Sequence, residues 1–153
     1  MMFSKACVYG LRAALYVATL DKQAFVPIKT ISDHLDISFH FLTKILQTLT
    51  QHHIMLSYRG PNGGIALARP AEQINAIQIV EAIDGTRLFS DCILDLPGCG
   101  TQRPCPMHEQ WSRIRSEMKH LLETTTLAGL SERISQFDLR ITADEGGLNS
   151  PGG

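Results

Sequence analysis

Three cysteines and one histidine are close together in the second half of the chain. Cys92, Cys99, Cys105 and His108 are separated by six, five and two residues, whereas the remaining cysteine, Cys7, is near the N-terminus. Thiolate and imidazole groups are ligands for iron–sulfur clusters and for soft or borderline metal ions. The segment that carries them is rich in Gly, Pro and Asp and lacks an apolar core, so a bound cofactor is one way to order it. The pattern therefore predicts a metal or iron–sulfur site.

Other chemistries fit the same four side chains. Zinc accepts a tetrahedral Cys3His set, but the irregular gaps contain no Cys-x2-Cys pair, which makes a zinc finger the weaker interpretation. In a thiol switch without metal, two loop cysteines would oxidise to a disulfide. A small iron–sulfur electron carrier would use the same ligands. The sequence has no phosphate-binding glycine loop, nucleophile elbow or Cys-x-x-Cys motif, so we expect no enzyme.

The charges are divided unevenly along the 153 residues. Residues 1–70 carry seven basic and three acidic side chains, and residues 71–153 carry seven basic and twelve acidic ones. A basic N-terminal half is compatible with nucleic-acid binding. A chain of this length holds one domain with a modest core and an accessory element. The sequence contains neither an apolar run of membrane-spanning length nor a signal peptide, so we expect a cytoplasmic protein whose cysteines are thiols or ligands.

The apolar spacing of the N-terminal third predicts a helix-turn-helix. Residues 4–20 repeat apolar side chains three and four positions apart, which makes one face of a helix. Thr30 is expected to cap a short helix over 31–35, with Asp33 three residues further on. After a turn at Asp36, Ser38 is expected to cap a longer helix. The inward face of that helix consists of Leu42, Ile45, Leu46 and Leu49.

A hairpin and three further helices follow. Residues 54–59 and 65–69 predict two short strands around a glycine-rich turn, which is the layout of a wing. A helix is expected over 76–84, ended by Gly85. A long helix is expected over 107–123 and a shorter one near 127–134. The long helix carries a stripe spaced three, four and three residues apart, suited to a partner helix: Trp111, Ile114, Met118 and Leu121.

In their order and spacing these motifs resemble the Rrf-type winged-helix repressors of bacteria, the group that contains the iron–sulfur regulator IscR and the nitric-oxide sensor NsrR. The resemblance runs from about Phe3 to Glu132. The motifs that carry it are Ser4-Lys5-Ala6-Cys7, Tyr9-Gly10-Leu11-Arg12-Ala13, Ile37-Ser38, Arg59-Gly60-Pro61-Asn62-Gly63-Gly64, Glu81-Ala82-Ile83-Asp84-Gly85 and the three-cysteine loop. It implies a homodimer that binds near-palindromic operators and, in most members, represses transcription.

The expected fold class is mainly α, a winged helix-turn-helix with a small β-hairpin plus a long dimerisation helix. We expect a DNA-binding domain over 1–85, a cluster-binding loop over 86–106, the dimerisation and return helices over 107–135, and a tail over 136–153 whose end is disordered.

The resemblance assigns a double-stranded DNA-binding face. The recognition helix would present short polar and basic groups to base edges and phosphates: Ser38, His40, Thr43, Lys44 and Gln47. In the wing, Arg59 would lie in or beside the minor groove, which attracts arginine. The turn residues would approach phosphate closely: Gly60, Pro61, Gly63 and Gly64. Of Phe39 and Phe41, one is expected to pack inward.

The resemblance also implies a ligand set. Cys92, Cys99 and Cys105 would be the thiolate ligands, and His108, three residues after the last cysteine, the fourth. In nitric-oxide sensors of the family an acidic residue from the partner's first helix serves instead, and the matching Val8 has no ligating group. Cys7 is expected to be a small buried thiol. The gap from Cys92 to Cys99 is one residue longer than the usual five.

We therefore expect a 2Fe–2S cluster with Cys3His ligation that senses cluster supply, iron or redox state. The alternative within the family is a nitric-oxide-sensing repressor with a 4Fe–4S cluster.

Overall fold

A computed structural model describes residues 2–20, 25–100 and 102–143. Its elements, in chain order, are α1 (Lys5–Thr19), α2 (Ile28–Leu35), α3 (Phe39–Gln51), β1 (Met55–Tyr58), β2 (Gly64–Leu67), the 3₁₀ turn η1 (Ala71–Gln73), α4 (Ala76–Asp84), the 3₁₀ turn η2 (Arg87–Phe89), α5 (His108–Thr124) and α6 (Leu127–Phe137). The mainly α fold class is confirmed. The disorder predicted for the end of the tail concerns residues 144–153, which lie outside the described residues.

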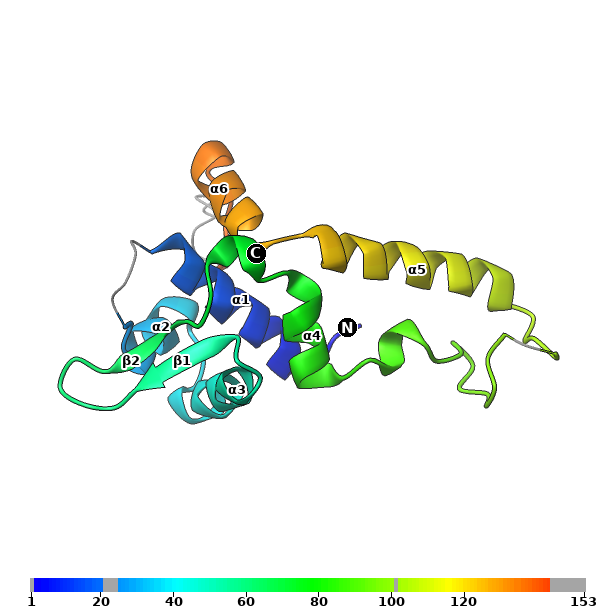
Figure 1. The fold of residues 1–153 in the computed structure, drawn as a ribbon, viewed down its shortest axis with the longest axis horizontal. Coiled ribbons are helices and arrows are strands. Elements are labelled where there is room, and N and C mark those ends of the chain that lie inside the picture. The colour runs from blue at the N-terminus through cyan, green and yellow to red at the C-terminus, as the bar shows by residue number, and fades with distance from the viewer. Residues whose placement is uncertain (1, 21–24, 101, 144–153) are drawn as a thin grey trace, which may run out of the picture.

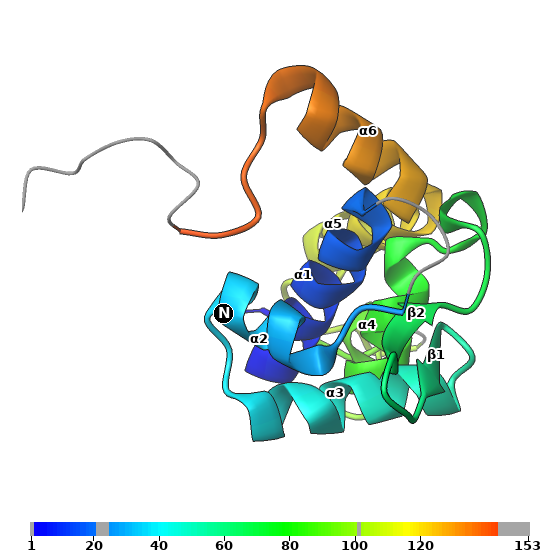
Figure 2. The same ribbon diagram turned by 90° about the vertical axis from the view of Figure 1, so that its left-hand side faces the viewer.

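The head of the molecule is built around α1. Helices α2, α3 and α4 pack against it with the hairpin on one side, as Figures 1 and 2 show from two directions. The inward face predicted for α3 is confirmed, since its three leucines and its one isoleucine are all buried: Leu42, Ile45, Leu46 and Leu49. They join Ile31 of α2, Ile65 of β2 and Ile79 of α4 in one core.

The helix starts are set by local capping, and one prediction about them is wrong. Ser4 caps α1, its hydroxyl accepting a hydrogen bond from Cys7 N at 3.0 Å. The predicted start of α2 at Thr30 is incorrect, because the helix begins at Ile28, directly after Pro27. Pro27 occupies the N-cap with an extended ψ of 138°, so the first turn starts at Ile28 and Thr30 falls inside it. Ser38 occupies the cap position of α3, but its side chain makes no capping bond.

The wing is a two-stranded antiparallel sheet held to the head by one further bridge. In its register Met55 pairs with Leu67 and Tyr58 with Gly64. Val26 forms an isolated antiparallel bridge to Ile65, with both backbone hydrogen bonds at 2.8 Å. Gly64 lies against this bridge, and a Cβ atom on it would be 2.1 Å from the Val26 carbonyl oxygen. The wing therefore needs glycine at this position.

After α4 the chain leaves the head through η2 and the cysteine loop, and α5 runs back to the head from the far end of this arm, where α6 follows it (Figure 1). Asn75 and Thr126 form a bridge where the chain comes back, and the Ser131 hydroxyl of α6 donates to the Ala18 carbonyl of α1 at 3.3 Å. Between α4 and α5 lie η2 and the loop that contains the three cysteines. Within the part of the chain that the structure describes, none of the helices has the length and apolar character to cross a membrane.

Replacing Gly64 by alanine is expected to lower the free energy of unfolding by about 2–3 kcal/mol, because the new Cβ meets backbone and the residue keeps a φ of +155°. The matched control is Gly85→Ala. Gly85 also has positive φ, at +79°, but its Cβ would meet nothing within 4 Å, so strain alone should cost about 1 kcal/mol. Thermal unfolding followed by circular dichroism measures both. Equal losses would show that contact with Val26 is not the cause.

Candidate functional site

The four predicted ligands meet as two pairs. Cys92 Sγ lies 3.5 Å from Cys105 Sγ, and Cys99 Sγ lies 3.4 Å from His108 Nδ1. Two thiolates on one tetrahedral metal with bonds of about 2.3 Å stand about 3.8 Å apart, so each pair has the spacing of two ligands on one metal. Among the described residues no three His, Cys, Asp or Glu side chains are placed to hold a single ion. Cys92 also interacts with Cys99, so the two pairs adjoin each other.

The two thiols of the first pair, Cys92 and Cys105, have pKa values shifted in opposite directions. The pKa of Cys92 is lowered because its sulfur accepts hydrogen bonds from the backbone N–H groups of Leu96 and Leu94, the latter at 3.4 Å. The pKa of Cys105 is raised by burial and by its hydrogen bond with Cys92. Of the two thiols, Cys92 is therefore the more acidic.

Asp91, the residue before the first cysteine, fastens the loop to α5. Its carbonyl oxygen accepts hydrogen bonds from Trp111 Nε1 at 3.0 Å and from Arg115 Nη1 at 2.9 Å. Its carboxylate is paired with Arg87 Nε at 2.7 Å. Trp111 and Arg115 are four residues apart, so both project from one face of the helix. These contacts bring Cys92 to the start of α5, where His108 is the first residue.

Gly100 lets the chain pass beside the histidine ring. Its φ is +94°, and a Cβ atom there would be 2.4 Å from the Cε1 atom of His108. The imidazole is thereby held next to Cys99, which directly precedes the glycine. A side chain at position 100 would push the ring away from the thiol, so the loop is shaped around the pairing of Cys99 with His108.

A second clamp ties the loop to the head. Asp84, the last residue of α4, accepts a hydrogen bond from Ser4 N at 2.8 Å, and its other carboxylate oxygen accepts one from the Ser4 hydroxyl. Because Ser4 also caps α1, one carboxylate joins the end of α4 to the start of α1. The first loop cysteine, Cys92, follows Asp84 by eight residues, so the chain that leads into the loop starts from a point fixed to the helix at the centre of the head.

Cys7 is separate from the loop cysteines. Its side chain is 0% exposed, and burial, with the charge of Asp84, raises its pKa to about 12. The prediction of a small buried thiol is confirmed.

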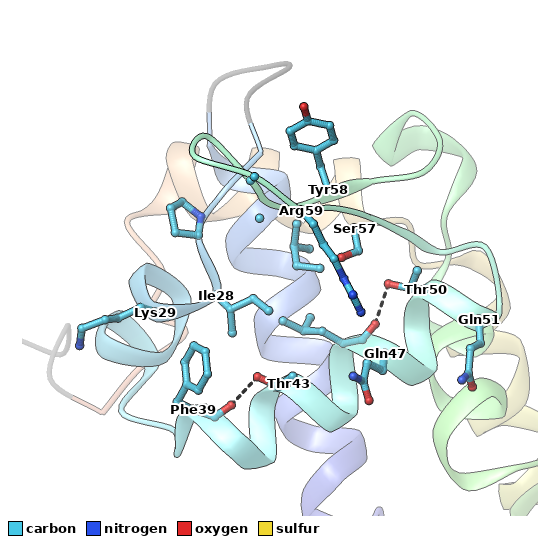
Figure 3. A pocket seen from close by; sticks show the side chains of 16 residues that line it. Ile28, Lys29, Phe39, Thr43, Gln47, Thr50, Gln51, Ser57, Tyr58 and Arg59 are labelled. Atoms are coloured by element: carbon cyan, nitrogen blue, oxygen red, sulfur yellow. Dashed lines mark hydrogen bonds between the residues drawn. The ribbon is translucent and has the colours of Figure 1, made fainter.

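The predicted DNA-binding residues line or flank one groove. A groove of about 900 Å3 runs between α3 and the wing, and Figure 3 shows it from close by. Five predicted residues line it: Thr43, Gln47, Arg59, Gly60 and Gly63. The other four are exposed but do not line the groove: Ser38, His40, Lys44 and Pro61. Arg59 points from the wing into the groove toward α3 (Figure 3), rather than outward from the hairpin tip.

Sequence reasoning missed part of this groove. Phe39 lines it and is 46% exposed, whereas Phe41 packs edge-on against Tyr9 in the head, so Phe41 is the inward member of the pair. The other unpredicted lining side chains include Lys29, Thr50, Gln51, Ser57 and Tyr58. Thr50 and Gln51 follow Gln47 by three and four residues, a helical spacing that the sequence already contains. Tyr58 and Lys29 carry no such signal.

The apolar stripe predicted for α5 is uncovered in the single chain. Ile114 is 54% and Leu121 62% exposed, and Met118 is half-buried. Trp111 differs from them, because its indole N–H is already bonded to the Asp91 carbonyl of its own chain. That role in holding the loop was not apparent from the spacing.

Comparison with known proteins gives one consistent result. The Rrf2 family, described as iron-dependent transcriptional regulators, matches residues 3–133. The chain belongs to the Rrf2 family. IscR of Sodalis glossinidius is 30% identical over 122 residues, which are 80% of this chain and 73% of that protein. Rrf2 relatives of this kind are HTH-type transcriptional regulators and not enzymes, and this chain is a DNA-binding regulator of that family.

Solved structures agree with the Rrf2 assignment. CymR, titled the global cysteine regulator of B. subtilis, matches with a TM-score of 0.71 at 26% identity, over 85% of this chain and 95% of its own. T. potens IscR matches with a TM-score of 0.73 over 90% of both chains, but at 20% identity it supports the fold alone. The winged-helix prediction is confirmed.

In the folded, metal-free protein at about pH 8, iodoacetamide should modify Cys99 and Cys105, the two loop cysteines that are not buried, and spare Cys7. A thiol with a pKa of about 12 is ionised only about once in ten thousand molecules at that pH, and Cys7 is also enclosed. Peptide mass spectrometry locates the modified residues. In guanidinium all four should react. Modification of Cys7 in the folded protein at the rate of the loop cysteines would contradict this placement.

Proposed function

We propose that this protein is a homodimeric, cytoplasmic Rrf2-family repressor whose operator binding is controlled by a 2Fe–2S cluster held by Cys92, Cys99, Cys105 and His108. The observation that supports it most is the division of these four donors into two pairs at 3.5 and 3.4 Å. A dinuclear cluster takes two protein ligands on each iron, and this donor set supplies them. The cluster would report cluster supply, iron or redox state.

The residues present fit such a group better than the alternatives. A single zinc ion would need three or four donors around one point, and the described side chains form no such set. The nitric-oxide-sensing 4Fe–4S alternative needs an acidic ligand in the first helix, where this chain has Val8. A disulfide between Cys92 and Cys105 remains the competing chemistry, since their sulfurs are adjacent and CymR, a cysteine regulator, is similar in structure.

When bound, a cluster supplies a redox-sensitive cross-link between the loop and the first turn of α5. The chain transmits a change at this cross-link through groups already fixed in place. The Asp91 carbonyl joins the loop to Trp111 and Arg115. The Asp84 carboxylate joins the end of α4 to Ser4 and the start of α1. A rearranged loop would therefore turn the arm relative to the head.

Homodimer formation would convert that rotation into operator control. The exposed stripe on α5 supplies an apolar surface for a second α5. Two heads on paired arms bind half-sites about 34–36 Å apart, so a change in their relative placement changes operator affinity. On each head, the groove between α3 and the wing would receive DNA.

Anaerobically purified protein should be red-brown and contain about two irons and two sulfides per chain. Cys99→Ala should lose most of both and the visible absorption, because it removes one member of a ligand pair. Cys7→Ala is the matched control and should keep its cluster. Iron, sulfide and zinc assays on the same samples decide the chemistry. Colourless protein that holds zinc, or that holds no metal even after reconstitution, would discard cluster control.

Lys44→Ala should weaken binding to a random-sequence duplex and make its salt dependence less steep by about one unit of slope per subunit, because one phosphate contact is lost. Fluorescence anisotropy over a series of salt concentrations measures the slope. Arg113→Ala removes an equal charge from α5, far from the groove (Figure 1), and should leave the slope unchanged. Equal slopes for wild type and Lys44→Ala would remove Lys44 from the DNA-binding face.

A further inference from the structure

Arg115 contacts the cysteine loop at two places. The same Nη1 atom that donates to the Asp91 carbonyl at 2.9 Å lies 3.6 Å from Cys99 Sγ, within hydrogen-bonding range for sulfur. The side chain is half-buried between α5 and the loop. Thus a permanently charged guanidinium lies against one of the four proposed ligands, although it cannot itself be a ligand.

The charge of Arg115 is not neutralised by a neighbouring acid. The carboxylate of Asp91 is paired with Arg87, which also reaches Asp95 at 3.8 Å. On α5, Arg113 pairs with Glu109 and Lys119 with Glu123. Within the part of the chain that the structure describes, Arg115 forms no ion pair with a carboxylate, and its charge is directed at a carbonyl and a sulfur.

We propose that Arg115 is a positioning residue that raises the reduction potential of the cluster site by donating a charged hydrogen bond to the Cys99 sulfur. This inference rests on the proposed function. Two ferric ions, two sulfides, three thiolates and a neutral imidazole carry a net charge of −1. One-electron reduction by dithionite converts one ferric ion to ferrous and makes the charge −2, with no bond formed or broken. A cation at a ligand sulfur stabilises the more negative state more strongly.

The test compares three variants by titration with dithionite, followed by visible absorption and by electron paramagnetic resonance of the reduced form. Arg115→Gln keeps a donor and loses the charge, and its midpoint potential should fall by about 59 mV, a tenfold change in a one-electron equilibrium. Arg115→Lys keeps the charge on a shorter side chain, and its midpoint potential should fall by less. Trp111→Phe removes the other donor to the Asp91 carbonyl and keeps the charge, so it reports the effect of loosening the loop, and its potential should fall by less than that of either Arg115 variant.

Each outcome either supports or overturns the role of Arg115. A potential for Arg115→Gln equal to that of wild type overturns the role of Arg115. A drop of the same size in Trp111→Phe also overturns it, because loosening of the loop would then be the cause. If Arg115→Gln takes up no iron, the midpoint potential of Arg115→Lys must lie below that of Trp111→Phe. Equal potentials for these two variants overturn the inference. Wild-type protein without iron and sulfide overturns the proposed function, and this inference with it.

Discussion

The carbonyl oxygen of Asp91 is the point on which the arrangement of the cysteine loop depends. A loop rich in Gly and Pro buries little apolar surface and has no packing of its own to fix it. Two donors one helical turn apart, Trp111 and Arg115, converge on this single acceptor and fasten the loop to α5. Cys92 is the next residue, so the anchor decides where the first thiol lies. The pairing of Cys92 with Cys105, and of Cys99 with His108, follows from that placement.

The cysteine loop lies at the end of the arm that is farthest from the wing (Figure 1), and hydrogen bonds hold the chain on both sides of it. On the head side, Asp84 connects the end of α4 with the cap of α1, and α1 packs against α3 and α4 in the core. On the arm side, the first residue of α5 is itself one of the paired donors, His108. A change in the loop would therefore reach the head through α4 on one side and along α5, whose C-terminal end is hydrogen-bonded to Ala76, on the other.

Elements whose determinants are local were predicted from the sequence, and those set by distant contacts were not. The periodicity of α3 and the glycine that ends α4 define those helices because side-chain spacing and backbone freedom act within one or two turns. The start of α2 was misplaced because Pro27 was not recognised as the residue before the first turn. The Asn75–Gln78 capping box was overlooked, although its spacing is visible in the sequence. The Asp91 acceptor had no signal, because every residue has a carbonyl group. Likewise the two ligand pairs are interleaved along the chain, because Cys99 lies between Cys92 and Cys105. Spacing alone therefore could not predict which residues pair.

The distance between the cysteine loop and the wing bears on how a signal at the loop would reach DNA. The wing and the cysteine loop lie at opposite ends of the molecule (Figure 1). At physiological ionic strength, exposed charges are screened over about 8 Å, so one added electron at the loop exerts little direct field on phosphates in the groove. Electrostatics can act at the loop itself, where the guanidinium of Arg115 lies 3.6 Å from the Cys99 sulfur. Under the proposed function, control of DNA binding would then be mechanical, carried by the packed helices α4 and α1 and by the relative placement of two heads.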